Sequence, residues 1–238
     1  MNNTRKERVE DILELKGKIY GSQIFGELNK AWVTGTIEDE FSFSHEYMLE
    51  KFYANRIGVK RRSGSVDHIP IIVPEILINE FKGVSVKGKY VELGGDFRSY
   101  PKIYEDNRSH LEKYFLVRMI KTCEKNEINE VCDINVIYLE GCIARKPVYR
   151  ETIFGKKITE LFLRVNRQNL CFDLIPCIAW EREALYASGF CEGDRVRVYG
   201  RIQSREYFKR VAPFSEEGVT KETHEISICR IQKVPKIL

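Results

Sequence analysis

The chain has 238 residues, of which 43% are hydrophobic and 31% charged, and its formal net charge is +4 at pH 7. This composition excludes a largely disordered chain, a collagen-like repeat and a membrane bundle. No apolar run approaches the roughly 18 residues of a transmembrane helix, and the charged N-terminal segment lacks the apolar core of a secretory signal. We therefore expect a cytoplasmic protein of one or two domains without a membrane partner.

The spacing of cysteine and histidine residues gives no sign of a metal centre. The seven cysteines form no CxxC pair, and the four histidines are scattered. A disulfide framework is not expected in a chain of this length without a secretory signal. We expect buried, reduced thiols and no metal or other cofactor.

In chain order, the first predicted element is a helix at 4–16, where Thr4 and Glu7 have the spacing of a capping box. The polar segment 121–131 has the composition of a linker. Between this helix and the linker, the alternation of apolar and polar residues and the turn residues predict further elements. These are strands at Lys30–Ile37, Lys51–Val59 and Val66–Val73, a helix at Glu75–Phe81, and strands at Lys89–Leu93 and Tyr114–Lys121.

The second half shows the same order of elements. Strands are predicted at Val136–Ile143, Thr159–Arg167 and Cys171–Trp180, a helix at Glu181–Cys191, and strands at Arg195–Gln203 and Thr223–Gln232. A five-stranded barrel with a helix after its third strand is the plan of the OB-fold. The predicted fold class is therefore all-β with short helices, built as two tandem five-stranded OB-fold barrels.

Internal sequence similarity supports two copies. Asn29–Gly35 resembles Asn135–Gly141, Asp67–Val73 resembles Asp173–Ala179, and Gly94 aligns with Gly200, all at an offset of 106 residues. Between them Asn55-Arg56 matches Asn166-Arg167 at an offset of 111, which predicts a longer central hairpin in the first copy. The predicted domains are an N-terminal helical extension (1–24), a diverged first OB-fold (25–122), a linker (123–132) and a second OB-fold (133–238).

The strongest local signal for function lies in the fourth strand of the second copy. In a regular strand the odd positions share one face, and here they alternate arginines with aromatic residues. Arginines neutralise phosphates, and aromatic rings stack on unpaired bases. A solvated, ordinarily charged strand face is the alternative. The candidate nucleic-acid-binding residues of this strand are Arg195, Arg197, Tyr199, Arg201, Gln203, Arg205 and Tyr207.

Basic and aromatic residues elsewhere extend this candidate site. They lie in the loop after the first strand of the second copy, on its second and third strands, and at the hairpin tip of the first copy. A solvated turn is the alternative for the tip, and a core position is the alternative for Trp180. In chain order these candidates are Lys60, Arg61, Arg62, Arg145, Lys146, Arg150, Phe162, Arg164, Asn166, Arg167, Phe172 and Trp180.

The second copy resembles the bacterial and phage single-stranded DNA-binding protein (SSB) family over about residues 133–232. The resemblance rests on Arg145-x-Pro147, Val165-Asn166-Arg167, Asp173-x-Ile175-x-Cys177-x-Ala179-Trp180 and Gly193-Asp194-x-Val196-x-Val198-x-Gly200-Arg201-Ile202-Gln203. It implies a non-enzymatic protein that wraps single-stranded DNA in replication, recombination and repair.

The resemblance also implies roles for particular residues. Base-stacking roles carry over to Trp180 and Tyr207, whereas a third stacking position holds Leu174, with Phe172 the nearest aromatic residue. Family members with two OB-folds imply a homodimer with four OB-folds. The acidic tail that recruits repair proteins in the family is not expected, since the chain stops at Leu238.

At the offset of 106 the first copy lacks the binding face of the second. Four of the five binding-type positions become apolar or small, so we expect its fourth strand to be buried against another domain or subunit. Arg195, Arg197, Tyr199, Arg201 and Arg205 correspond to Lys89, Val91, Leu93, Gly95 and Ser99.

Three functions stay open. No P-loop, GxSxG, HExxH or GxGxxG motif is present, so we expect no catalytic residues. The first function is binding of single-stranded DNA. The second is that of a primosome-type OB-fold adapter, in which contacts to replication or repair proteins dominate. The third is RNA binding, because stacking does not read the 2′-hydroxyl.

Overall fold

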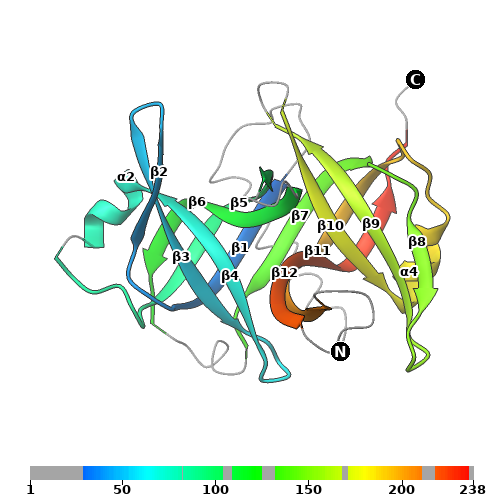
Figure 1. Ribbon diagram of the computed structural model, residues 1–238, viewed down its shortest axis with the longest axis horizontal. Helices are drawn as coiled ribbons and strands as arrows, with labels where there is room; N and C mark the ends of the chain where they lie inside the picture. Colours follow the sequence, from blue (N-terminus) through cyan, green and yellow to red (C-terminus); the bar gives the residue numbers. More distant parts are fainter. Residues whose placement is uncertain are drawn as a thin grey trace.

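The computed structural model describes residues 29–81, 83–103, 109–124, 132–167, 171–210 and 218–235. The predicted helix at 4–16 and most of the predicted linker lie outside these ranges. The described chain forms two β-barrels side by side, joined into one 12-stranded sheet (Figure 1). No helix among the described residues is long and apolar enough to cross a membrane.

The first barrel closes because β1 pairs with both β3 and β5, and because β4 pairs in parallel with β6. A short α-helix and a 3₁₀ turn follow the third strand of the barrel, as predicted. The elements are β1 (Asn29–Ile37), β2 (Ser42–Tyr47), β3 (Glu50–Lys60), β4 (Val66–Pro74), α2 (Glu75–Ile78), η1 (Asn79–Phe81), β5 (Tyr90–Ile103) and β6 (Ser109–Thr122).

The second barrel repeats these pairings, with β7 against both β9 and β11 and β10 parallel to β12. The prediction of two tandem OB-fold barrels is confirmed. The elements are β7 (Asn135–Ile143), β8 (Val148–Glu151), β9 (Lys157–Asn166), β10 (Phe172–Trp180), α4 (Glu181–Ser188), β11 (Arg195–Arg210) and β12 (Gly218–Lys233).

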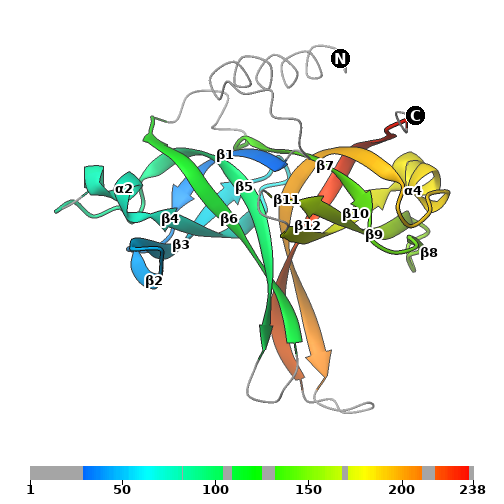
Figure 2. The same ribbon diagram turned by 90° about the horizontal axis from the view of Figure 1, so that it is seen from above.

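The elements differ from the prediction mainly outside the barrels. The short strands β2 and β8 were missed because all their side chains are exposed, so they carry no alternation of buried positions. The strand pairs β5–β6 and β11–β12 are longer than predicted. They leave the barrels as two-stranded hairpins that project from the same side of the molecule (Figure 2).

The cores of the barrels consist mainly of alternating apolar residues. Val196, Val198 and Ile202 of β11 point inward, as predicted. All seven cysteines are free, but the expected burial of the thiols is wrong, since only one is buried and three are exposed. The exposed cysteines are Cys171, Cys191 and Cys229.

The register of the repeat needs one correction in the fourth strand. Ala31 faces Gly95 in the first barrel, and its counterpart Ile137 faces Gly200 in the second. Gly95 rather than Gly94 is therefore the partner of Gly200, and the offset in this strand is 105. A slip of one residue exchanges the two faces of a strand, so the comparison that predicted a lost binding face was made between opposite faces.

The central hairpins need a second correction. Lys60 pairs with Val66 and Asn166 with Phe172, which keeps the offset at 106 and makes the two hairpins equal in length. The match of Asn55-Arg56 to Asn166-Arg167 is therefore wrong. Arg61 is the true counterpart of Arg167.

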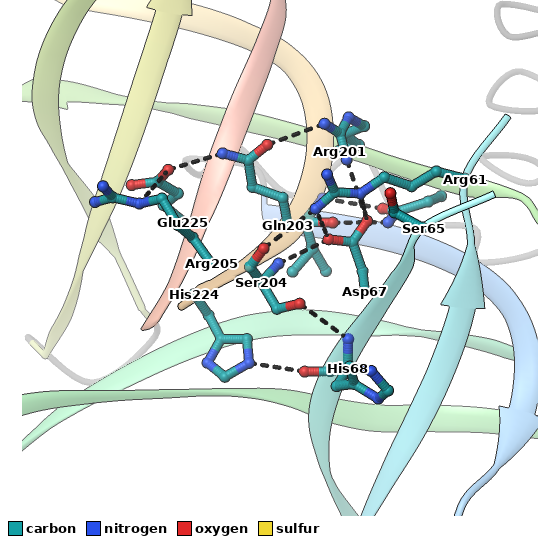
Figure 3. Close-up of polar contacts among 12 residues, drawn as sticks. Arg61, Ser65, Asp67, His68, Arg201, Gln203, Ser204, Arg205, His224 and Glu225 are labelled. Atoms are coloured by element: carbon teal, nitrogen blue, oxygen red, sulfur yellow. Dashed lines mark hydrogen bonds and ion pairs between the residues drawn. The ribbon is translucent and has the colours of Figure 1, made fainter. Parts of the chain in front are cut away.

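A buried aspartate of the first barrel anchors the fourth strand of the second (Figure 3). The carboxylate of Asp67 is fully buried and accepts hydrogen bonds from Arg61, from Arg201 Nη1 at 3.1 Å and from the Ser204 backbone N–H at 2.8 Å. The Oγ of Ser204 accepts from the backbone N–H of His68 at 3.1 Å. We call this set the Asp67 clamp.

The Asp173 clamp is the counterpart of the Asp67 clamp, with Arg98 in the place of Arg201. The fully buried carboxylate of Asp173 accepts from Arg167, from Arg98 Nη1 at 2.9 Å and from the Ser99 N–H at 2.8 Å. The Oγ of Ser99 accepts from the Leu174 N–H at 2.8 Å. Together with the β1–β7 pairing, the two clamps hold the barrels in one orientation.

Candidate nucleic-acid interface

A groove with a volume of about 1100 Å³ runs between the barrels and along the two projecting hairpins. Both barrels contribute cationic, aromatic and acidic side chains to its walls. The acidic residues are Glu112, Glu160, Glu222 and Glu225. The cationic, histidine and aromatic residues are His45, Tyr100, His110, Lys113, Tyr114, Arg145, Phe162, Arg205, Tyr207, Lys221 and His224.

The second barrel carries two stacked pairs of arginine and phenylalanine, of which the pair of Arg145 and Phe162 lines the groove. The Arg145 guanidinium carbon lies 4.0 Å from the ring centroid of Phe162, and that of Arg164 lies 4.6 Å from the centroid of Phe172. Alternation along β9 places Phe162 and Arg164 on the same outer face. The two pairs form a strip that offers planar surfaces for stacking and positive charge for phosphates.

The β11–β12 hairpin supplies Arg205 and Tyr207. The Arg205 side chain is half exposed, and its Nε lies 3.6 Å from Glu225, whose carboxylate also accepts a 2.7 Å hydrogen bond from Gln203. Tyr207 is 37% exposed. Both side chains are therefore accessible from the groove.

The β5–β6 hairpin contributes residues that the sequence analysis missed. The rings of Tyr100 and Tyr114 contact edge to face at a centroid distance of 5.8 Å, and burial raises the pKa of both hydroxyls. Lys113 Nζ donates to Thr223 Oγ1 at 3.0 Å, which joins the two hairpins, and burial lowers the pKa of this lysine.

His224 lies at the base of the β11–β12 hairpin where the barrels meet. Its Nε2 is 2.8 Å from the backbone carbonyl of His68, and burial lowers the pKa of its imidazole. Beside it Arg56 of β3 forms a 2.5 Å ion pair with Glu222 of β12. Polar contacts between the barrels thus line the floor of the groove.

Several candidate residues of β11 lie away from the groove. Arg195 and Arg197 both pair with the buried Glu140 of β7, and the hydrogen bond to Glu140 raises the pKa of Arg197. The ring of Tyr199 contacts that of Tyr138 edge to face at 5.1 Å. The first half of the predicted face therefore lies over the joined β7–β11 sheet.

The remaining candidates are divided between the clamps and the surface. Arg61, Arg167 and Arg201 hold buried aspartates in the clamps. Arg150 pairs with Glu160 at the edge of the groove, whereas Trp180, partly buried, ends β10 outside the groove lining. Lys60, Arg62, Lys146 and Asn166 are exposed next to turns or loops.

The corrected offset of 105 would have revealed part of the missed wall. It aligns Tyr100 with Arg205, so the first barrel places an aromatic residue where the second places an arginine.

Among the described residues, no group of three or more histidine, cysteine or acidic side chains could hold a metal ion.

Comparisons with known proteins agree with this architecture. The sequence model of the single-strand binding protein family matches residues 134–234. The wild-type single-stranded DNA binding protein from Thermus aquaticus superimposes with a TM-score of 0.68 at 17% identity, over 89% of this chain and 95% of that chain. A deletion mutant of that protein gives 0.68 at 16% identity, over 90% and 98% of the two chains. A search of curated proteins finds no match.

Proposed function

We propose that this chain, whose second barrel belongs to the single-strand binding protein family, is a non-enzymatic protein that binds single-stranded DNA in the groove between its barrels. The observation that carries the proposal is the convergence of cations and exposed rings from both barrels on one groove. Arginines and lysines there neutralise phosphates, and rings such as Tyr207 stack on unpaired bases. Because the clamps fix the walls before DNA arrives, little ordering is needed on binding.

We further propose roles in DNA replication, recombination and repair, and assembly as a homodimer with four OB-folds. The homodimer rests on the resemblance to family members with two OB-folds, since each chain here supplies two barrels. One argument for a protein adapter, the apolar fourth strand of the first barrel, loses its basis, because Val91 and Leu93 of this strand are core residues. They therefore leave no surplus apolar face for a partner protein.

The test compares two arginines of the same strand. Arg205 lines the groove and Arg197 lies on the β7–β11 sheet, and both side chains are 50% exposed. Binding of a fluorescein-labelled dT oligonucleotide is measured by anisotropy at two salt concentrations. We expect Arg205→Ala and Tyr207→Ala each to weaken binding about 5- to 30-fold, from a loss of about 1–2 kcal/mol per stacking or phosphate contact.

Arg197→Ala is the matched control and is expected to change affinity less than about twofold, because Arg197 does not line the groove and its partner Glu140 keeps Arg195. Affinity should also fall with salt, with a slope of about −0.7 per neutralised phosphate. Equal losses for Arg197→Ala and Arg205→Ala would place the DNA elsewhere. Absence of binding at low salt would refute the function, and tighter binding of a matched RNA would reassign it to RNA.

A further inference from the structure

The β2–β3 hairpin of the first barrel exposes aromatic side chains that no core requires. All six residues of β2 are exposed, and the strand forms one end of the 12-stranded sheet. Phe43 is 60% exposed and Tyr47 is 61% exposed. An edge strand that exposes aromatic side chains, with Glu46 as its one carboxylate, is a liability unless it has a binding role.

Two rings of this hairpin are already arranged as a stack. The rings of His45 and Phe52 lie at an interplanar angle of 5°, with centroids 4.8 Å apart. His45 also lines the groove, together with its neighbour Ser44. The stack is therefore continuous with the surface that carries Tyr207 and Phe162.

The tip of the hairpin has a backbone that its residues adopt rarely. Met48 and Leu49 have φ angles of 50° and 65°, and their side chains are 81% and 95% exposed. A two-residue turn with positive φ favours asparagine and glycine, so methionine and leucine carry a conformational cost here. Strained apolar residues that face solvent indicate a contact made outside the folded chain.

The second barrel does not repeat this arrangement. By strand pairing, His45 faces Phe52 in the first barrel, and Arg150 faces Ile158 at the matching place in the second. Ile158 is a core residue with 3% exposure, so the second barrel has no ring stack at this place. The stacked pair is a property of the first barrel alone.

We propose that the β2–β3 hairpin is a second stacking site for the unpaired bases of single-stranded DNA, continuous with the groove. Bases that leave the groove stack on the His45–Phe52 pair and continue over Tyr47 towards the tip. The first barrel thus binds DNA through its β2–β3 hairpin and not through its fourth strand. This inference rests on the function proposed above.

The test uses labelled dT oligonucleotides of two lengths, about 8 and about 24 nucleotides, the first short enough for one OB-fold and the second long enough to extend beyond it. Tyr47→Ala, which lies outside the groove lining, is expected to weaken binding of the longer oligonucleotide about fivefold or more and to leave the shorter one unchanged. His45→Ala is expected to weaken binding of the longer oligonucleotide more than that of the shorter one, because His45 also lines the groove. His45→Phe, which keeps a ring for stacking, should bind like the wild type. Tyr149→Ala, at an exposed position of the matching hairpin in the second barrel, is the control.

Photocrosslinking of the full chain to an oligonucleotide that contains 5-iododeoxyuridine supplies an independent readout. Crosslinks within residues 42–53 support the proposal. If Tyr207→Ala weakens both lengths while the hairpin variants weaken neither, the hairpin site is refuted and the groove function stands. A protein would then be the remaining class of partner for the hairpin. If Tyr207→Ala also has no effect, the groove function itself fails.

Discussion

Replacing Asp173 by alanine is expected to lower the free energy of unfolding by about 3 kcal/mol, because a buried ion network loses its central anion. The change removes the acceptor of Arg167, of Arg98 at 2.9 Å and of the Ser99 N–H at 2.8 Å. Breaking a buried pair from one side costs about 3–5 kcal/mol. The lower end applies here because Arg98 keeps Asp96 as a partner at 2.7 Å and the Arg167 side chain is 28% exposed.

Urea denaturation followed by tryptophan fluorescence measures this loss, since Trp32 reports on the first barrel and Trp180 on the second. With m near about 3 kcal/mol/M, the midpoint should fall by about 1 M. Arg164→Ala is the control, because its cation–π contact with Phe172 is worth about 1 kcal/mol or less. A loss below about 1 kcal/mol for Asp173→Ala would show that the clamp does not hold the barrels together.

Two further perturbations test the packing and the groove floor. A Cβ at Gly200 would lie 2.5 Å from the Ser227 carbonyl oxygen, so Gly200→Ala should lower the thermal midpoint by several degrees, at a cost of about 1–3 kcal/mol in the free energy of unfolding. Gly189→Ala is the control and should leave the midpoint unchanged, because a Cβ at Gly189 would lie 3.6 Å from its nearest neighbour. Burial lowers the pKa of His224, so the unfolded chain takes up the proton first and stability should fall as pH drops below about 6.5. Thermal unfolding across this pH range should show a smaller loss for His224→Gln than for the wild type, and an unchanged loss would contradict the assignment.

Much of the fold follows from sequence patterns because barrel strands bury alternate residues. Apolar alternation located the first strand of each barrel within two residues of its observed bounds. It did the same for the strands that contain Ile69-Pro70 and Ile175-Pro176. The parts that sequence reasoning missed bury little. Strand β2 has no buried position, and the hairpin ends of β5 and β11 lie beyond the barrels. Backbone pairing, which leaves no period in the sequence, determines their length.

The candidate site was harder to predict because one strand meets three environments. Odd positions of β11 do share a face, but that face runs from Glu140 on the joined sheet, through the clamp at Asp67, to the groove. An arginine pattern alone cannot separate these surroundings. Arg197, Arg201 and Arg205 occupy equivalent alternating positions in the sequence. In the structure, Arg197 pairs with Glu140 on the joined sheet, Arg201 belongs to the Asp67 clamp, and Arg205 lines the groove.

The two clamps are nearly symmetric, whereas the surfaces that they position differ. The second barrel presents arginine–phenylalanine pairs, and the first presents tyrosines and the His45–Phe52 ring stack at its hairpin. A chain with identical barrels would offer the same contacts twice, once from each barrel. Both walls of the groove combine charged residues with rings, but among the described lining residues the arginines lie only on the wall of the second barrel. Phosphate neutralisation and stacking are therefore available on both sides, with guanidinium groups on one side only. Divergence of the first barrel therefore changed the kind of contact that it can make with DNA and kept the interface that orients it.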